Sequence, residues 1–316
     1  MSNQIHYTLC PVCGSAGISE VFKVKDNTVS QEYFEIDHCR NCQARFTQNP
    51  PSEASMGAYY KSEDYISHTD TSKGLINRIY RLVRNFSINQ KKDLVEKNTG
   101  LKNGNLLDVG SGTGHFASAM QKAGWKVTGL EPDEGARAVA DKEHSLDLLP
   151  SAELFNLPGK KFNAITLWHV LEHVHDVKKY IGAFKNLLAD DGKLFIAVPN
   201  YTSYDAVKYK EYWAGYDVPR HLYHFTPFTM HWLMKESGLK IVAVKPMWFD
   251  SFYVSLLSSK YKSGDTKWFS AFWTGLISNF KAMNDVRKCS SVIYIISRKL
   301  TKDSFGDRVS NDQDNY

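Results

Sequence analysis

The sequence predicts an α/β protein in which a doubly wound, mostly parallel sheet follows a small N-terminal zinc ribbon. From Asn105 onward, short apolar strands alternate with helical segments, a pattern that requires a parallel sheet with helices on both faces. A glycine-rich turn follows the first of these strands. Upstream, four of the five cysteines form two CxxC pairs, which is how a chain builds a tetrahedral thiolate site.

Length and composition limit the possible functions. The chain has 316 residues, enough for one large domain or two smaller ones, and it is 42% hydrophobic and 23% charged, as in ordinary globular proteins. Its net charge of +5 permits an anionic substrate but does not identify a nucleic-acid binder. We expect a cytoplasmic protein without a membrane span, because it has no long apolar run and residues 1–8 lack signal-peptide features. The oligomeric state is left open.

The N-terminal ribbon is predicted over residues 1–48. Its ligands are two pairs, Cys10 with Cys13 and Cys39 with Cys42, and alternating polarity predicts strands at 20–24 and 33–36. Two disulfides or free thiols are the alternatives, but an unexported chain favours Zn²⁺. Four thiolates close the coordination shell, so the metal is expected to be structural, with Cys289 uninvolved.

A linker and helical lid is predicted over residues 49–104. A proline-rich break at 49–52 is followed by a polar, tyrosine-rich stretch, and apolar residues then recur at helical spacing over 74–98. Arginines and lysines lie along this helix, and we expect them to be solvated, with nucleic-acid contact as the alternative.

The main domain is predicted over residues 105–300. Four strands, at 106–109, 126–130, 162–167 and 193–198, alternate with helices at 115–123, 135–142 and 177–188. Two later strands, at 240–245 and 291–296, flank an aromatic-rich, helical stretch over 248–280. The tail, 301–316, is polar and is expected to be disordered.

The glycine-rich turn indicates a nucleoside-containing cofactor. Gly110, Gly112 and Gly114 allow a sharp turn and a close approach of ligand to backbone, and Glu131 ends the next strand, where a carboxylate accepts ribose hydroxyls. A loose dinucleotide pattern is also present, but a carboxylate at Asp108 suits a cationic ligand better than a pyrophosphate. No Walker lysine follows, which disfavours a triphosphate.

Four segments together resemble the class I S-adenosylmethionine-dependent methyltransferases. They are LDVGSGTG at 107–114, GLEP at 129–132, LWHVLEHV at 167–174 and LADDGKLFIAVPN at 188–200. The resemblance covers about residues 105–296 and implies a seven-stranded sheet whose last strand is inserted antiparallel. With the cysteine module it is similar to a small-molecule subgroup that includes zinc-containing sugar C-methyltransferases, which implies a small-molecule or carrier-bound acceptor.

The resemblance also assigns cofactor contacts. The three glycines would face the methionine part, Glu131 the ribose, and Ser151 with Ala152 the adenine. Asp108, just before the glycines, is expected to contact the cofactor as well, because it suits a cationic ligand. Trp168 and His169 follow the fourth strand, where cofactor and acceptor would meet.

Histidines are the candidates for a proton-accepting group, because methyl transfer needs a positioned acceptor and, for some acceptors, a base near neutral pKa. His169 lies in one cluster, and His169 with His173 has a spacing that can bind metal on a helix. A second cluster, over 217–226, contains His221 and His224 as possible bases and Arg220 as a possible anion clamp. The resemblance points to His221, and the alternative is that this cluster only ties down a loop.

The predicted function is methyl transfer from S-adenosylmethionine to a small-molecule or carrier-bound acceptor. One alternative is an RNA methyltransferase that grips RNA with its zinc ribbon, but between Cys10 and Cys42 acidic residues outnumber basic ones. Nucleic acid is therefore not the expected partner. An alternative of another class is a non-catalytic assembly module, which the intact glycine turn and Glu131 disfavour.

Overall fold

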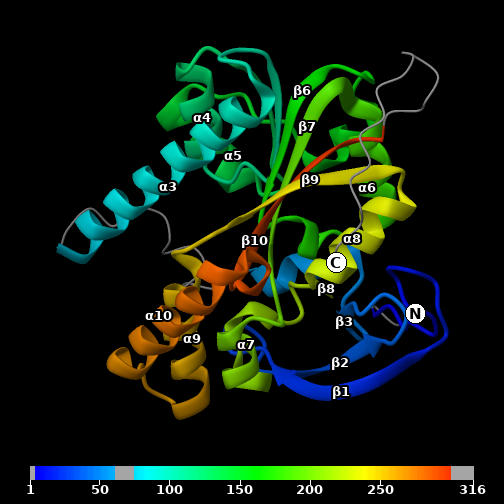
Figure 1. The fold of residues 1–316 in the computed structure, drawn as a ribbon, viewed down its shortest axis with the longest axis vertical. Coiled ribbons are helices and arrows are strands. Elements are labelled where there is room, and N and C mark those ends of the chain that lie inside the picture. Colours follow the sequence, from blue (N-terminus) through cyan, green and yellow to red (C-terminus); the bar gives the residue numbers. More distant parts are fainter. Residues whose placement is uncertain (1–3, 61–74, 300–316) are drawn as a thin grey trace.

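The computed structural model describes residues 4–60 and 75–299, and for 75–82 the backbone only. The predicted tail, 301–316, and part of the predicted lid therefore lie outside the described residues. A mixed sheet runs through the centre of the molecule (Figure 1), in the order β5-β4-β6-β7-β10-β9. Its strands are β4 Asn105–Val109, β5 Lys126–Leu130, β6 Phe162–Trp168, β7 Leu188–Pro199, β9 Leu239–Pro246 and β10 Ser291–Arg298.

The sheet confirms the parallel core and the inserted last strand. β4 pairs in parallel with β5 and β6, and β6 pairs in parallel with β7, whereas β10 is antiparallel to both β7 and β9. The described residues form six strands in this sheet, so the expected seventh strand is not confirmed. Its place beyond β5 is taken by a single parallel bridge between Leu130 and Leu149. Pro150 follows directly, and proline cannot donate the next ladder hydrogen bond.

Helices cover the sheet on both faces, as Figure 1 shows for α3, α4 and α5 on one side and α6 and α8 on the other. Their bounds are α3 Leu75–Thr99, α4 His115–Lys122, α5 Glu134–His144, α6 Val177–Leu187 and α8 Pro227–Glu236. Val95 of α3 and Phe116 of α4 pack on one face of the sheet, against Leu106 and Phe195. The inner strands β4, β6 and β10 are buried on both faces, which explains why they read as nearly continuous apolar runs.

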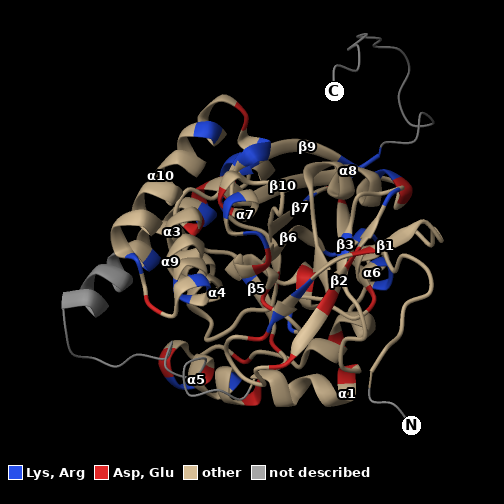
Figure 2. Ribbon diagram, turned by 90° about the horizontal axis from the view of Figure 1, so that it is seen from below, with Lys and Arg blue, Asp and Glu red and all other residues tan. Residues whose placement is uncertain are grey.

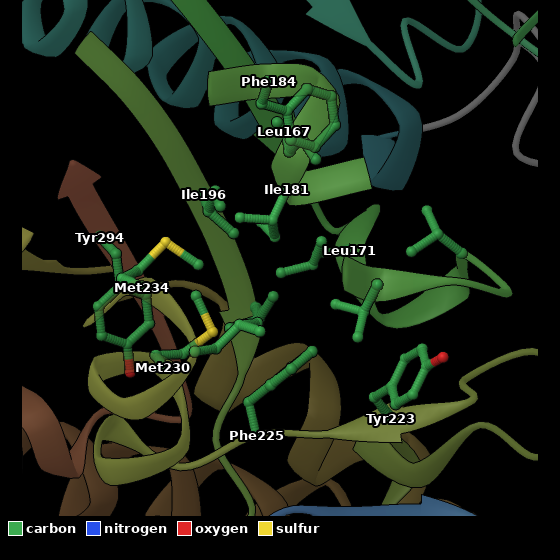
Figure 3. Close-up of a cluster of buried hydrophobic side chains, with 14 of the residues drawn as sticks. Leu167, Leu171, Ile181, Phe184, Ile196, Tyr223, Phe225, Met230, Met234 and Tyr294 are labelled. Carbon is green, nitrogen blue, oxygen red and sulfur yellow. The ribbon is translucent and has the colours of Figure 1, made fainter. Parts of the chain in front are cut away.

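The larger core lies on the opposite face. There the strand residues Leu167, Ile196 and Tyr294 meet α6 and α8, and the same cluster continues to Phe225 (Figure 3). Cys39 and Cys42 belong to this cluster as well. The cysteine module is therefore packed into the main hydrophobic core.

The ribbon sheet is completed by a strand from the far end of the sequence. β1 Ile18–Lys25, β2 Tyr33–Cys39 and β3 Arg45–Thr47 are antiparallel, and β3 pairs in turn with β8 Tyr223–His224. Arg45 lies opposite His224, and the backbone N–H of Thr47 donates to Leu222 O at 3.0 Å. The boundary at residue 48 stays a prediction, and this pairing links the two sides of it.

The aromatic stretch forms a helical hairpin between β9 and β10, made of α9 Asp250–Ser263 and α10 Trp268–Asn284. α10 exposes several large apolar side chains, with Phe269 78% exposed. No helix among the described residues is long and apolar enough to span a bilayer. The short helices are α1 Glu53–Met56, η1 Gly57–Tyr60, η2 Ser151–Asn156, η3 Leu171–His173, α7 Tyr204–Tyr209, η4 Lys210–Tyr212, η5 Ala214–Tyr216 and η6 Val286–Lys288.

Candidate functional site

The glycine turn between β4 and α4 is left-handed at all three glycines, with φ of 71° at Gly110, 54° at Gly112 and 81° at Gly114. A Cβ on Gly110 would lie 2.4 Å from the side chain of Val170, so this glycine is required for packing. A Cβ on Gly112 would have no other atom within 4 Å. Only Gly112 therefore faces open space, on the side where a ligand can approach the backbone.

Glu131 lies at the end of β5 beside this turn. Its Oε2 accepts from the N–H of Gly112 at 2.7 Å, and its Oε1 accepts from the N–H of Asp133 at 3.0 Å. Burial raises its pKa, while these two N–H groups oppose the rise. Each oxygen keeps a lone pair, so the carboxylate can still accept two hydroxyl hydrogen bonds.

Asp108 is almost completely buried in β4. Its Oδ1 accepts from the hydroxyl of Thr166 at 2.7 Å. Burial raises the pKa of Asp108 to about 6, against the effect of the Thr166 and Ser111 hydrogen bonds. A carboxylate that loses its proton only near neutrality favours a nearby cationic group.

The residues expected to contact adenine, Ser151 and Ala152, follow a segment that pairs with the backbone of Glu131. The backbone N–H of Glu131 donates to Leu149 O at 2.9 Å, and Ser151 and Ala152 begin the following helix, η2. Trp168 ends β6, in edge contact with Phe116 and with Lys91 Nζ 4.7 Å from its ring centroid. One end of the sheet is thus surrounded by Glu131, Ser151, Ala152 and Trp168. Their contacts with a ligand stay predictions.

His169 is held between two carboxylates. Its Nε2 lies 2.9 Å from Asp250 Oδ2 and its Nδ1 lies 3.2 Å from Glu172 Oε1. Burial lowers its pKa, but the Asp250 and Glu172 charges outweigh burial and raise the pKa of His169 to about 10. His169 is therefore an imidazolium at neutral pH and has no lone pair with which to accept a proton.

The segment after His169 does not form the α-helix that a metal-binding spacing of four requires. Leu171–His173 is a single 3₁₀ turn, and His169 before it has φ of 59°. His169 and His173 therefore do not share a helical face. His173 instead places Nδ1 3.1 Å from Arg220 O and 3.0 Å from the Tyr60 hydroxyl, and burial lowers its pKa to about 4.

Arg220 is occupied by partners inside the protein. Its guanidinium donates to both oxygens of Asp217, at 3.0 and 2.6 Å, to Asp26 Oδ1 at 3.1 Å and to Tyr59 O at 3.0 Å. The side chain is almost fully buried. These contacts tie the ribbon to the body, as the loop-tying alternative expects, and leave little capacity for a substrate anion.

The other two candidate bases differ in their surroundings. His224 is buried at the pairing of β3 and β8, 3.4 Å from the Thr47 hydroxyl, and burial holds its pKa well below the usual range. His221 lies beside His173, with ring centroids 4.5 Å apart, and its Nδ1 lies 2.9 Å from Gly215 O. A carbonyl can only accept, so His221 donates from Nδ1, and in the neutral ring the lone pair is on Nε2, which lies 4.0 Å from Asp217 Oδ2.

Sequence reasoning missed Asp250, Lys91 and Asp26. Asp250 comes from the start of α9, 81 residues after His169, which it contacts. Lys91 was placed on a solvated helical face, but it packs over Trp168, and burial lowers its pKa. Only Asp26 carried a local signal, because Asp followed by Thr and Ser at two and four residues is typical of a side chain that closes a turn.

The four ribbon cysteines converge on one point. Their sulfurs all lie within 4.8 Å of one another, with Cys10 Sγ 3.7 Å from Cys42 Sγ and Cys13 Sγ 3.4 Å from Cys39 Sγ. Sulfurs around a tetrahedral Zn²⁺ at 2.3 Å are about 3.8 Å apart. The donor set therefore fits the metal, and Cys289 lies elsewhere, against Met247.

Comparison with known proteins identifies the α/β domain. A family described as a methyltransferase domain matches residues 77–244. A ubiquinone biosynthesis O-methyltransferase of Actinobacillus pleuropneumoniae serotype 5b is 38% identical over 118 residues, 34% of this chain and 50% of that protein. An uncharacterized methyltransferase of Staphylococcus carnosus is 29% identical over 126 residues, 39% of this chain and 59% of that protein. The chain thus spans about half the length of the curated relatives it matches.

Among solved structures, the chain resembles the 1,6-didemethyltoxoflavin-N1-methyltransferase of Burkholderia thailandensis. The TM-score is 0.47 at 14% identity, over 84% of this chain and 99% of that one.

Proposed function

The chain belongs to the methyltransferase-domain family that matches its residues 77–244, and from this membership we propose that it transfers a methyl group from S-adenosylmethionine to a small-molecule or carrier-bound acceptor. The observation that carries the proposal is the pairing of Gly112, open to ligand, with Glu131, whose carboxylate is buried beside it. A nucleoside bound there would donate its ribose hydroxyls to Glu131, and another part of the cofactor would lie against the backbone of the glycine turn.

The remaining cofactor contacts follow from the charges at the site. S-adenosylmethionine carries a sulfonium and an ammonium group, and the buried Asp108 supplies an opposing charge above pH 6. Ser151 and Ala152 flank the proposed adenine position, and Trp168 with His169 lies at the side where the methyl group leaves. The chemistry supplied by the cofactor is an activated methyl group on a good leaving group, so the protein mainly positions the acceptor.

Of the three candidate bases, His221 fits the chemistry best. His169 is charged and His224 is sealed between the ribbon and the body, whereas His221 keeps a lone pair on Nε2. Both ring N–H groups of His169 are used by Asp250 and Glu172, so its charge would serve to hold these two carboxylates in place beside the transfer point.

The cysteine set would hold a structural Zn²⁺, with no open position for substrate. RNA remains the alternative acceptor. Figure 2 shows acidic and basic positions mixed over β1 and β2, where Lys23 pairs with Glu35 at 3.1 Å. A surface that grips the phosphate backbone needs a continuous basic stripe, so a small or carrier-bound acceptor is favoured. The cytoplasmic location stays a prediction.

Two measurements test the proposal. Calorimetry should show micromolar binding of S-adenosylmethionine, equivalent to about 8 kcal/mol, and no tight binding of NAD. Incubation of a cell extract with methyl-labelled cofactor and the protein should then place label in the small-molecule or carrier-protein fraction. Label confined to RNA would move the assignment to the RNA alternative, and absent cofactor binding would leave the assembly-module alternative.

The role of His221 is tested by His221→Asn, which keeps size and polarity but has no base near neutral pH. Loss of a positioned base lowers turnover by about 10²- to 10⁴-fold, with cofactor affinity unchanged. His224→Asn and His169→Asn are the parallel variants. Normal turnover in His221→Asn would exclude His221 as the base.

A further inference from the structure

A second cluster of metal-type ligands lies near the proposed transfer point, apart from the cysteines. One carboxylate oxygen of Glu172 and one ring nitrogen each of His173 and His221 all lie within 4.8 Å of one another. Two distant segments supply them, because Glu172 and His173 follow β6 whereas His221 follows η5. The N–H of Leu222 donates to Glu172 O at 2.7 Å and holds these segments together.

The free atoms of this cluster are the ones that a cation would need. Glu172 is fully buried; its Oε1 faces His169, and its Oε2 has no hydrogen-bond partner among the described residues. A buried carboxylate oxygen without a partner is costly, so it indicates a missing ligand. Oε2 is therefore the oxygen available to a cation.

Both imidazoles are oriented in the way that metal-binding histidines are. His173 Nδ1 lies 3.1 Å from Arg220 O, and His221 Nδ1 lies 2.9 Å from Gly215 O. A carbonyl only accepts, so His221 Nδ1 donates to Gly215 O and His173 Nδ1 donates to Arg220 O, with the Tyr60 hydroxyl 3.0 Å from His173 Nδ1 as a second acceptor. In the neutral rings the lone pair is then on Nε2. A carbonyl behind the ring is the usual outer partner of a ligating histidine, since it fixes the tautomer and the ring plane.

We propose that Glu172, His173 and His221 form a binding site for a first-row divalent cation, such as Mn²⁺, Fe²⁺, Co²⁺ or Zn²⁺. Two imidazoles and one carboxylate suit these ions, whereas Mg²⁺ and Ca²⁺ prefer oxygen ligands. Ligands held at 2.0–2.2 Å are about 3 to 4 Å apart, so an inward shift of about 1 Å closes the cluster on an ion. Three protein ligands leave positions open.

The open positions give the site a use in the proposed reaction. They would bind and orient an oxygen atom of the acceptor, hydroxyl or carboxylate, beside the departing methyl group; this part rests on the proposed function. The cation would also occupy the lone pair of His221, so His221 would be a ligand and not the proton acceptor. A substitution at His173 distinguishes the two roles of His221. A metal site needs His173 as a second imidazole ligand, whereas His221 acting alone as a base does not need it.

The other histidine cluster supplies a contrast. His115, Glu143 and His144 also lie within ligand distance of one another. There, however, His144 Nε2 and His115 Nδ1 lie 3.1 Å apart in a hydrogen bond, and Glu143 is exposed. Two of the donor atoms already satisfy each other, so this cluster needs no cation.

The site is tested by titrating Mn²⁺ into full-length protein that holds one equivalent of Zn²⁺, the amount that the cysteines take up. Mn²⁺ is a poor ion for thiolates, so loss of the free Mn²⁺ electron paramagnetic resonance signal reports the second site. We expect one bound Mn²⁺ per chain in the wild type. Glu172→Gln, His173→Asn and His221→Asn should each weaken it by at least about 100-fold, because even an outer partner of a ligand is worth 10- to 100-fold.

His175→Asn is the matched control, since it lies in the same loop and its Nε2 contacts Pro51 O outside the cluster. It should bind Mn²⁺ like the wild type. S-adenosylmethionine binding, measured on every variant, reports intact folding, and the two histidine variants decide the question if Glu172→Gln fails to fold. A wild type that binds neither Mn²⁺ nor Co²⁺, or binding that survives in folded Glu172→Gln and His221→Asn, overturns the site. Mn²⁺ binding without cofactor binding would instead contradict the proposed function alone.

Discussion

Two regions of the molecule contain the same types of charged and polar residues but differ in how these are paired. One is the junction between the ribbon and the body, and the other is the end of the central sheet beside the glycine turn. At the junction, Arg220 joins Asp26 and Asp217, so these three charges are paired inside the protein. Two nitrogens there, Arg45 Nε and His224 Nδ1, are nevertheless buried without a partner among the described residues. At the sheet end, Glu172 Oε2 and Trp168 Nε1 are buried without partners, and Gly112 faces open space.

The difference teaches how to tell a structural cluster from a working one. A closed set of hydrogen bonds stabilises the fold and has nothing left for a ligand, whereas a fully buried carboxylate oxygen without a partner is costly enough to indicate a group still to arrive. Substitutions at the junction should therefore act on stability, and those at the sheet end on binding and turnover.

The largest effect is expected from Cys39→Ser, on the ribbon side of the comparison. Removal of one thiolate should abolish Zn²⁺ binding, whose free energy in small modules is about 10–16 kcal/mol and counts as folding energy. Because Cys39 belongs to the main core, loss of the ribbon should also destabilise the α/β body. Metal analysis and a thermal melt measure both. Cys289→Ser is the control and should keep one zinc per chain; a zinc content below one in the wild type would contradict the site.

The next effect is expected at the junction itself. Arg220→Met leaves the buried Asp26 and the partly buried Asp217 without their cation. This costs about 3–5 kcal/mol, and urea unfolding should show it. Lys160→Met breaks the exposed pair with Asp190 and should cost less than about 1 kcal/mol. If Arg220→Met kept its stability but lost turnover, the junction would belong with the working residues and the comparison would fail.

A smaller effect is expected at the cofactor side. Glu131→Ala should weaken S-adenosylmethionine binding at least about tenfold, or about 1.4 kcal/mol, because the proposed ribose acceptor is gone. Glu134→Ala, an exposed carboxylate at the start of α5, should bind as the wild type does. Calorimetry measures both, and equal affinities in the two variants would remove Glu131 from the site.

The smallest effect is a pH dependence that arises at His169. Its pKa of about 10 in the folded protein exceeds the unfolded value of 6.5, because Asp250 and Glu172 outweigh burial. The folded state thus holds the proton more tightly, so this stabilisation is complete below pH 6.5 and is lost as pH rises through 10. After solvent screening of a side chain 31% exposed, the contribution is on the order of 1 kcal/mol. The difference in unfolding free energy between wild type and His169→Gln should shrink over this window; a constant difference would show that His169 is neutral.

Much of the fold was predictable because it depends on local patterns. The β4 to β7 strands and their helices follow from apolar periodicity and glycine turns. Their ends lie near the expected residues except at β7, which begins at Leu188 instead of at residue 193. The seventh strand was implied by resemblance and not by residues, and it is not confirmed. The segment at 146–150 makes a single bridge, at Leu149, before Pro150. β8, with two residues, is too short to have a periodicity.

The site was predictable where its residues are close in sequence. The glycine turn with Glu131 and the CxxC pairs are local signals, and the structure brings each set together. The contact of Asp250 with His169 and the pairing of Glu172 with His221 were not predictable. These contacts span 81 and 49 residues of the sequence, so they depend on how distant segments pack. Arg220 showed the reverse: its sequence context fits an anion clamp, and only the buried Asp26 reveals that it is already neutralised.

The pairing of β3 with β8 has a consequence for the order in which the molecule can assemble. Residues 45–46 pair with residues 223–224, which are synthesised much later. The ribbon therefore emerges from the ribosome with one edge unpaired, and that edge stays unpaired until more than half of the α/β domain has been made. An exposed strand edge is a template for wrong pairing. Early binding of Zn²⁺ by the four cysteines would keep the ribbon folded until β8 has been synthesised. The metal would then protect the nascent chain from wrong pairing as well as stabilise the folded protein.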